Sequence, residues 1–236
     1  MSMETYHKIF QSGIPCAIKL NWRGEPTLHK DLIEMIVYAK EKGVQEVLLN
    51  TNGLLLDRDM SLALADAGLD WLIISVDGAT KETYESIRLG GDWETLFNNI
   101  TRIHMIYSRI KKHPKVRLQI CKQPANEHEI SLWKETFSWF SDNLRIGKLF
   151  NPQGEANWKI KQPKKCKQLW QRLVIDWQGN IHPCCSDFNG RFILGNIKDM
   201  TIKEVWHSYR MNYFRYSLSH FGRSKTSLCQ NCSSYC

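Results

Sequence analysis

The chain alternates, over its first 150 residues, between short apolar runs and longer segments in which apolar residues recur at helical spacing. The run WLIISV is continuous and apolar, as in a buried strand, whereas DLIEMIVYAKEK has helical spacing and is followed by glycine. Strands that alternate with helices form βαβ units with parallel strands, so we predict a parallel α/β sheet. The predicted strands are residues 17–22, 46–50, 71–76, 115–120 and 144–150, and the predicted helices are 31–42, 57–67, 81–88, 93–111 and 127–141.

Polar segments that contain glycine follow three of these strands: residues 23–26 (RGEP), 50–53 (NTNG) and 75–78 (SVDG). Periodicity does not decide between an open, doubly wound sheet and a partial barrel, but both folds bind ligands at the carboxyl ends of their strands. Each segment alone is compatible with an ordinary turn between strand and helix. Three such ends in succession favour a shared pocket. Its candidate residues are Gly24, Glu25, Pro26, Asn50, Asn52, Ser75 and Asp77.

Four of these side chains have both a ligand-binding and a structural interpretation. Glu25 is suited to accept hydrogen bonds from an ammonium group, or else it lies in a solvated turn. Asp77 is suited to hold the hydroxyls of a ribose, or else it caps a turn or helix. Asn50 and Asn52 point the same way by strand alternation, and they either bind a polar ligand or shape a turn that ends at Gly53.

Charge and cysteine are concentrated in the last third of the chain. Residues 1–158 contain 19 Lys and Arg against 20 Asp and Glu, a net charge of −1, whereas residues 159–236 contain 13 against 4, a net charge of +9. Cysteine is concentrated in the same final part. We therefore predict a sheet domain over residues 1–150 and a cysteine-rich domain over 166–236, joined by a polar linker over 151–165.

The late cysteines have the spacing of thiolate metal ligands, with Cys229-x2-Cys232 and Cys232-x3-Cys236 close together in the chain. More distant partners are available in Cys166, Cys184 and Cys185. A disulfide framework is disfavoured because the N-terminus does not read as a secretory signal. An iron–sulfur module and a zinc module on nucleic acid remain, the second because of the basic excess.

Other residues near these cysteines are interpreted as structural. His182 precedes Pro183 and Cys184, and we expect it in a surface turn rather than as a ligand. The large apolar rings of the tryptophans in this region are expected in the core of the small domain. These are Trp170, Trp177 and Trp206.

Taken together, these segments resemble the radical S-adenosylmethionine (radical SAM) enzymes that carry a C-terminal SPASM domain, from about residue 15 onward. The resemblance implies a partial (β/α)6 TIM-like barrel that holds S-adenosylmethionine on a [4Fe–4S] cluster. The RGEP segment is similar to the family's GGEP element, with Arg for the first Gly, and this implies that Glu25 binds the methionine amino group. The NTNG segment resembles the stretch beside the cofactor. Ser75 and Asp77 stand where the family contacts the cofactor's ribose or carboxylate.

The late cysteines resemble the SPASM domain in order and spacing, through Cys166, then Gly179-x4-Cys184, then Cys229-x2-Cys232. Residues 175–181 are similar to its β-hairpin, with Gly179 in the turn. One [4Fe–4S] cluster takes four thiolates and two would take eight, so six cysteines predict one auxiliary cluster. Its expected ligands are Cys166, Cys184, Cys229, Cys232 and Cys236, with Cys185 as a substitute.

The family's defining motif, Cys-x3-Cys-x2-Cys, does not occur among the 236 residues, and Cys16 stands alone before the first predicted strand. We therefore expect the first barrel strand and its cysteine loop to be missing here. Either the chain is part of a longer enzyme, or it is a barrel that has lost radical chemistry.

The resemblance leaves three functional hypotheses. The first is a radical SAM/SPASM enzyme, or part of one, that generates a 5′-deoxyadenosyl radical to modify a peptide or small molecule, with an electron donor of the flavodoxin or ferredoxin type. The second is a non-catalytic relic or partner subunit that keeps one auxiliary cluster. The third is the zinc module on nucleic acid, which leaves the Gly179-x4-Cys184 context unexplained. A cytoplasmic protein without a membrane partner is expected, because no apolar run is long enough to span a bilayer.

Overall fold

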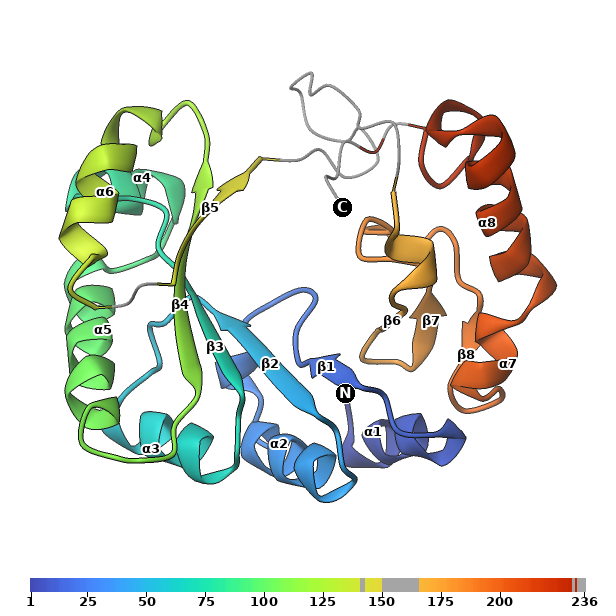
Figure 1. Ribbon diagram of the computed structural model, residues 1–236, viewed down its shortest axis with the longest axis horizontal. Coiled ribbons are helices and arrows are strands. Elements are labelled where there is room, and N and C mark those ends of the chain that lie inside the picture. Colours follow the sequence, from blue (N-terminus) through green and yellow to red (C-terminus); the bar gives the residue numbers. More distant parts are fainter. Residues whose placement is uncertain (141–142, 150–165, 231, 233–236) are drawn as a thin grey trace. The chain divides into compact units, whose positions relative to one another are not determined.

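The computed structural model describes residues 1–140, 143–149, 166–230 and 232. It divides the chain into two compact units (Figure 1). The sheet unit is Pro15–Leu149, and the cysteine-rich unit is Met1–Ile14 together with Phe150–Cys236. The first 14 residues, which the sequence analysis counted with the sheet domain, are thus grouped with the cysteine-rich part. The predicted linker at 151–165 lies outside the described residues.

Five parallel strands form the sheet of the first unit, in the order β1-β2-β3-β4-β5. The strands are β1 (Ala17–Lys19), β2 (Glu46–Thr51), β3 (Trp71–Ser75), β4 (Lys115–Lys122) and β5 (Leu144–Lys148). The helices are α2 (Leu32–Glu41), α3 (Arg58–Asp66), α4 (Lys81–Ile87), α5 (Trp93–Tyr107) and α6 (Ile130–Phe137), with single 3-10 turns at η2 (Pro26–Leu28) and η3 (Glu127–Glu129). The predicted strands and helices are confirmed. Because neighbouring strands follow the chain without a reversal of order, the sheet is that of an open barrel rather than a doubly wound fold.

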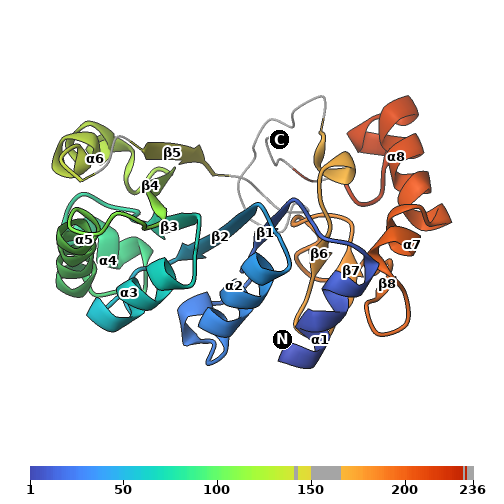
Figure 2. The same ribbon diagram turned by 60° about the horizontal axis from the view of Figure 1, so that its bottom comes forward.

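The helices of this unit cover one face of the sheet (Figures 1 and 2). In β2 the buried residues alternate with half-buried ones, so that Val47, Leu49 and Thr51 face the helices while Leu48 and Asn50 point to the other face. In the described part of this unit, no helix covers that second face. Polar side chains on it, near the carboxyl ends of the strands, are therefore placed to meet a ligand.

Short polar side chains begin the helices, as the sequence spacing favours. Asp57, Thr80 and Asp92 accept hydrogen bonds from the backbone of the first turns of α3, α4 and α5, which satisfies donors that have no partner inside a helix. Gly43 takes a φ of +89° directly after α2, a conformation that favours glycine. Within the described residues, no helix combines the length and the apolar content needed to cross a bilayer.

The cysteine-rich unit is built around a small antiparallel sheet in the order β6-β7-β8. Its elements are α1 (Met3–Ile9), η1 (Phe10–Ser12), η5 (Gln168–Trp170), β6 (Val174–Ile175), β7 (Asn180–His182), β8 (Gly195–Asn196), α7 (Ile202–Trp206), α8 (Tyr209–Phe221) and η6 (Arg223–Lys225). The predicted hairpin is confirmed, with Ile175 paired to Ile181 and Gly179 in its turn at a φ of +90°. A Cβ on Gly179 would lie 3.3 Å from Cγ2 of Thr5, so α1 packs closely against this turn.

Two expectations about this unit are wrong. His182 is not in a surface turn but in β7, with 1% of its surface exposed. Trp177 and Trp170 are not core residues, because they are 71% and 44% exposed, and Trp177 lies in the turn between β6 and β7. Trp206 is half-buried beneath the guanidinium of Arg215, 4.2 Å from its ring. The core of this unit holds the rings of Tyr6 and Phe214 together with aliphatic side chains. They include Ile181, Leu194, Ile197 and Val205.

Candidate functional site

The carboxylate of Glu25 joins the segment after β1 to the end of β2. Its Oε1 accepts hydrogen bonds from the Thr27 hydroxyl at 2.6 Å, the Thr27 backbone N–H at 3.1 Å and the Thr51 hydroxyl at 2.6 Å. Its Oε2 accepts one, from the backbone N–H of Asn52 at 2.8 Å. Glu25 is therefore not a solvated turn residue, and its Oε2 still has capacity for another donor.

Three polar side chains from neighbouring strands form a row beside Glu25. The Asn21 side-chain oxygen accepts a hydrogen bond from the backbone N–H of Asn50 at 3.1 Å, and the Asn50 amide donates to the Ser75 hydroxyl at 3.1 Å. Asn50 points to the sheet face that carries no helix, so the row faces away from the helical layer. Asn52 does not join it, because its side-chain oxygen accepts from Leu54 N–H at 2.9 Å and shapes the turn.

Asp77, next along the edge, is 4% exposed and binds groups of the chain with both carboxylate oxygens. Oδ1 accepts from the backbone N–H of Cys121 at 2.7 Å, while Oδ2 accepts from Arg88 Nε at 2.7 Å and lies 2.6 Å from Arg88 Nη2. The carboxylate therefore fixes β4 and the end of α4 around the loop that follows β3.

Glu129 also binds the loop that follows β3, at the residues that lead into α4. It is 6% exposed, and its carboxylate accepts hydrogen bonds from Ala79 N–H at 2.8 Å and from the Thr80 and Thr83 hydroxyls at 2.6 and 2.7 Å. Burial alone would raise the pKa of Glu129, but these hydrogen bonds outweigh it and hold the pKa below its ordinary value. The charged carboxylate is thus the form that stabilises the start of α4.

Two cavities open on the sheet unit away from this edge. One, of about 570 Å³, lies between α3 and α5, and the other, of about 460 Å³, lies near the amino ends of the strands beside Lys40, Trp71 and Lys115. Neither is lined by the strand-end residues. We place the candidate site at the strand ends because polar groups from successive strands converge there and because ligands of such sheets bind at the carboxyl ends of the strands, whereas the two cavities lie away from those ends.

Four thiols from two distant segments come together in the cysteine-rich unit. Burial raises the pKa of the Cys184 thiol to about 12, and the nearby thiols of Cys185, Cys229 and Cys232 add to the increase. Cys184, Cys229 and Cys232 are all buried, and the Cys232 thiol lies 3.4 Å from the Ser186 hydroxyl. Of the other predicted ligands, Cys166 accepts from Gln168 N–H at 3.5 Å, and Cys236 lies outside the described residues.

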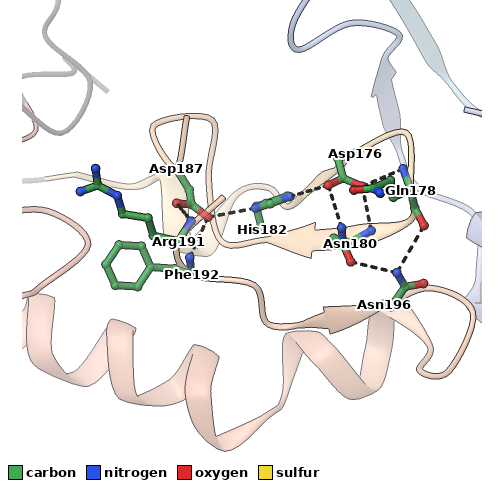
Figure 3. Close-up of polar contacts among 8 residues, drawn as sticks. All are labelled: Asp176, Gln178, Asn180, His182, Asp187, Arg191, Phe192 and Asn196. Atoms are coloured by element: carbon green, nitrogen blue, oxygen red, sulfur yellow. Dashed lines mark hydrogen bonds and ion pairs between the residues drawn. The ribbon is translucent and has the colours of Figure 1, made fainter. Parts of the chain in front are cut away.

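A buried histidine between two carboxylates holds the loop that carries Cys184 (Figure 3). His182 Nδ1 lies 2.9 Å from Asp187 Oδ2, and its Nε2 lies 3.2 Å from Asp176 Oδ2. Burial lowers the pKa of His182, but the hydrogen bonds to Asp187 and Asp176 outweigh it and leave the pKa raised. Because a neutral imidazole has one N–H, two carboxylate partners favour the doubly protonated form.

Asp187 also closes the loop that follows Cys184 and Cys185. Its carboxylate accepts hydrogen bonds from the backbone N–H groups of Arg191 at 2.9 Å and Phe192 at 3.1 Å. Asp176 does the same for the hairpin through Gln178 and Asn180 N–H, each at 2.9 Å. The histidine therefore joins the hairpin turn to the cysteine loop.

Comparison with known protein families assigns both units. A family model of the radical SAM superfamily matches residues 23–112, and a model described as an iron–sulfur cluster-binding domain, SPASM, matches residues 166–233. The chain combines a radical SAM domain with a SPASM domain. The expected fold and cofactor classes, S-adenosylmethionine and [4Fe–4S] clusters, are thereby confirmed.

Curated relatives share short segments with the radical SAM/SPASM chain. It is 46% identical over 65 residues to Fe-coproporphyrin III synthase of Methanosarcina barkeri, covering 28% of this chain and 16% of the relative. It is 39% identical over 59 residues to the S-adenosyl-L-methionine-dependent 2-deoxy-scyllo-inosamine dehydrogenase of Niallia circulans, covering 25% and 24%. It is 35% identical over 105 residues to a probable GTP 3′,8-cyclase of Methanococcus maripaludis, covering 43% and 35%. The matched segments thus span about a third or less of each relative.

Solved structures share the fold over nearly the whole chain. The crystal structure of BtrN in complex with AdoMet and 2-DOIA matches with a TM-score of 0.67 and 20% identity, covering 99% of this chain and 80% of BtrN. The structure of anSMEcpe with bound AdoMet matches with a TM-score of 0.70 and 17% identity, covering 98% and 76%. Streptococcus suis SuiB bound to its precursor peptide SuiA matches with a TM-score of 0.57 and 14% identity, covering 93% and 60%.

The structure brings only some of the predicted site residues of the radical SAM domain together. Glu25, Asn50 and Ser75 lie together at one edge, and Glu25 Oε2, with a single hydrogen bond from the chain, keeps capacity for a further donor. The side-chain oxygens of Asn52 and Asp77 instead bind the turn after β2 and the groups around the loop after β3. Gly24 has a φ of +75° with no atom within 4 Å of its Cβ position, and Pro26 begins η2. Sequence reasoning missed Asn21 and Glu129. Asn21 stands two residues past β1, so strand alternation could have predicted that it shares a face with the other strand-end residues. No pattern in the neighbouring sequence indicates the role of Glu129, whose partners lie about 50 residues away.

The thiols of the SPASM domain fit an iron–sulfur cluster by the chemistry of their donor set. Thiolate ligands suit iron–sulfur clusters, and three of these thiols, Cys184, Cys229 and Cys232, are buried. Among the described residues, no group of three Cys, His, Asp or Glu is arranged to hold a single metal ion.

Replacing Glu129 by Gln should destabilise the chain in a pH-dependent way. Because the pKa of Glu129 is lowered in the folded state, its contribution is fully present above its unfolded pKa and is lost as pH falls through the folded pKa. At pH 7 we expect a loss of about 1–3 kcal/mol in the free energy of unfolding, measured by urea denaturation. Glu127→Gln is the control, because its exposed ion pair with Lys122 contributes little. A Glu129→Gln effect equal to the control, or unchanged at low pH, would contradict this role.

Replacing Asp187 by Asn should expose the cysteine loop. The Asn amide would present N–H groups to the His182 ring, breaking a buried charged contact. In the reduced, metal-free chain, we expect Cys184 to be alkylated roughly tenfold faster or more, as measured by mass spectrometry of its peptide. The exposed Asp199→Asn is the matched control. Unchanged protection of Cys184 would show that His182 does not hold this loop.

Proposed function

We propose that this chain is the S-adenosylmethionine-binding and auxiliary-cluster part of a radical SAM/SPASM enzyme. The observation that carries the proposal is the row of Asn21, Asn50 and Ser75 beside Glu25, at the carboxyl edge of a sheet that matches the radical SAM family. S-adenosylmethionine, when cleaved reductively at a cluster of this family, supplies a 5′-deoxyadenosyl radical that removes a hydrogen atom from a substrate. The three-cysteine motif of that cluster is assigned to no residue here.

Each strand-end residue has a separate part in binding the cofactor. Glu25 Oε2 accepts a hydrogen bond from the ammonium group of the cofactor, while the Thr27 and Thr51 hydroxyls hold the other carboxylate oxygen in place. The Asn50 amide and the Ser75 hydroxyl present a donor and an acceptor to the polar atoms of the nucleoside. Gly24 and Pro26 shape the turn that brings Glu25 to this position.

In this proposal Asp77 does not bind the cofactor itself but holds the neighbouring loop in position. Both of its oxygens already accept hydrogen bonds from Arg88 and from the backbone of Cys121. A ribose hydroxyl would have to compete with a short ion pair that is largely buried on the Asp77 side. Asp77 therefore holds the loop after Ser75, and Asn52 likewise holds the turn after β2.

The auxiliary cluster is proposed to bind Cys184, Cys229 and Cys232, with Cys185 or Cys166 as a further ligand and Cys236 as a candidate outside the described residues. In this proposal the sheet domain binds S-adenosylmethionine and the cysteine-rich domain binds the auxiliary cluster, with residues 151–165 as the linker between them. Iron-binding thiols need a reducing compartment, which supports a cytoplasmic protein.

The substrate is proposed only by class, as a peptide or small organic molecule. SuiB binds a precursor peptide, and BtrN was crystallised with a small molecule, 2-DOIA. The relatives are named as a cyclase, a dehydrogenase and a coproporphyrin synthase, and the matched segments span 16–35% of each. Reduction of the cofactor needs a one-electron donor of the flavodoxin or ferredoxin type.

Anaerobic reconstitution with iron and sulfide tests the cluster assignment. We expect a brown protein with about four irons per chain and the absorption of a [4Fe–4S] cluster. Cys184→Ser should lose most of the iron, whereas Cys16→Ser, which changes an exposed thiol of the sheet unit, should keep it. Colourless protein that holds zinc instead would contradict the assignment and favour the zinc module.

Equilibrium dialysis with labelled S-adenosylmethionine tests the strand-end site. Glu25→Gln should weaken binding at least about tenfold, because a neutral amide attracts an ammonium less than a carboxylate does. Glu34→Gln, an exposed change on α2, is the control. Asn50→Ala should also weaken binding and leaves the Glu25 hydrogen bonds intact. A chain that binds the cluster but no S-adenosylmethionine would favour the non-catalytic relic or partner subunit.

A further inference from the structure

The cavity between α3 and α5 has no part in the proposed function. It lies on the helical layer of the sheet unit, where α3 and α5 are neighbours (Figures 1 and 2). It holds about 570 Å³ and is open to solvent along one side. An open groove covers less of a small molecule than a binding pocket does, so its shape favours a segment of another protein.

Three arginines surround this groove and no acidic residue lines it. Arg58 comes from α3, and Arg102 and Arg109 come from the face of α5 and the turn just beyond its end. Arg102 donates to the neutral Asn99 side chain at 2.5 Å, and Arg58 lies 4.0 Å from Asp59, with both side chains at least 75% exposed. In the described part of the chain, the Arg109 guanidinium has no ion-pair partner. Their positive charge is therefore largely uncompensated.

Apolar side chains line the groove between the guanidinium groups. They are Leu62 of α3 and Met105, Ile106 and Ile110 of α5 and its C-terminal turn. Met105 leaves 51% of its surface exposed. Arginine and methionine are enriched in protein interfaces, and an apolar floor between charged groups is the arrangement that an amphipathic helix fits.

The spacing of the arginines defines the complementary segment. Arg102 and Arg109 are seven residues apart in the chain, with Arg102 inside α5 and Arg109 two residues beyond its end, and both line the groove. Two carboxylates seven residues apart on a second helix lie on one face, about 10.5 Å apart along its axis at about 1.5 Å per residue, so one can pair with Arg102 and the other with Arg109 near the C-terminal end of α5. Apolar residues three and four positions after the first carboxylate would then face Met105 and Ile106.

We propose that the α3/α5 groove is a docking site for an acidic amphipathic helix of a partner protein. Carboxylates of the partner bind Arg102 and Arg109 from one side and Arg58 from the other, while its apolar residues fill the space over Leu62, Met105 and Ile110. This site is separate from the strand-end residues, so it stands whether or not the proposed function does.

A designed peptide tests the proposal on the full chain. The probe is a fluorescein-labelled, alanine-based helix with Glu at two positions seven apart and Leu three and four residues after the first Glu. We expect saturable binding by fluorescence polarisation that weakens as salt rises. The Arg58→Glu/Arg109→Glu chain should bind at least about tenfold more weakly, since two attractive charges become repulsive. Lys30→Glu/Lys134→Glu changes the net charge equally at exposed positions elsewhere and should bind as the unchanged chain does.

Other outcomes of the same experiment overturn the proposal. One is that a peptide with Lys in place of Glu binds the chain as tightly as the Glu peptide does. Another is that the Arg58→Glu/Arg109→Glu chain binds the Glu peptide as tightly as the unchanged chain does. Failure of the peptide to bind while dodecanoate binds would show a small-amphiphile site instead. Arg102→Gln, which keeps a hydrogen-bonding side chain beside Asn99, gives an independent variant, and circular dichroism establishes that each variant is folded.

Discussion

Parallel pairing of β1 to β4 decides where the polar groups of the radical SAM domain lie. Each strand returns through a helix to the same starting edge, so all of the carboxyl ends meet at the opposite edge. Asn21 and Asn50 are 29 residues apart in the chain, and Asn50 and Ser75 are 25 apart, yet each pair is within hydrogen-bond distance. A shift of one residue in register would turn these side chains into the helical layer. The site therefore depends on the same backbone hydrogen bonds that hold the sheet.

Three carboxylates make this edge rigid. Glu25, Asp77 and Glu129 each accept hydrogen bonds from backbone N–H groups of segments that lie far away in sequence. A buried carboxylate is costly unless its oxygens are bound, and here backbone amides and hydroxyls bind them. Motif residues thus have a structural task even before a ligand is considered. The free capacity at Glu25 Oε2 and the polar atoms of Asn50 and Ser75 are what this rigid edge can offer to a ligand.

The SPASM domain relies on a different source of order. Its strands are two or three residues long, and its core is small. The contact of His182 with Asp176 and Asp187 joins the hairpin to the cysteine loop in place of extended strand pairing. A cluster that binds Cys184, Cys229 and Cys232 would further join segments 45 residues apart, as metal sites do in other small domains.

The sequence by itself determined the strands, the helices and the hairpin, because apolar periodicity and turn residues act over a few neighbouring positions. It also determined which strand ends carry polar groups and how the cysteines are spaced. It did not determine that Asp77 binds Arg88, that Glu129 supports the loop after β3, or that His182 is buried while Trp177 is exposed. Those outcomes depend on partners from distant segments and on which side of the β6–β7 hairpin turn the rest of the unit covers. Local pattern carries no information about either, so only the tertiary structure decided which polar residues serve the fold and which stay free for a ligand.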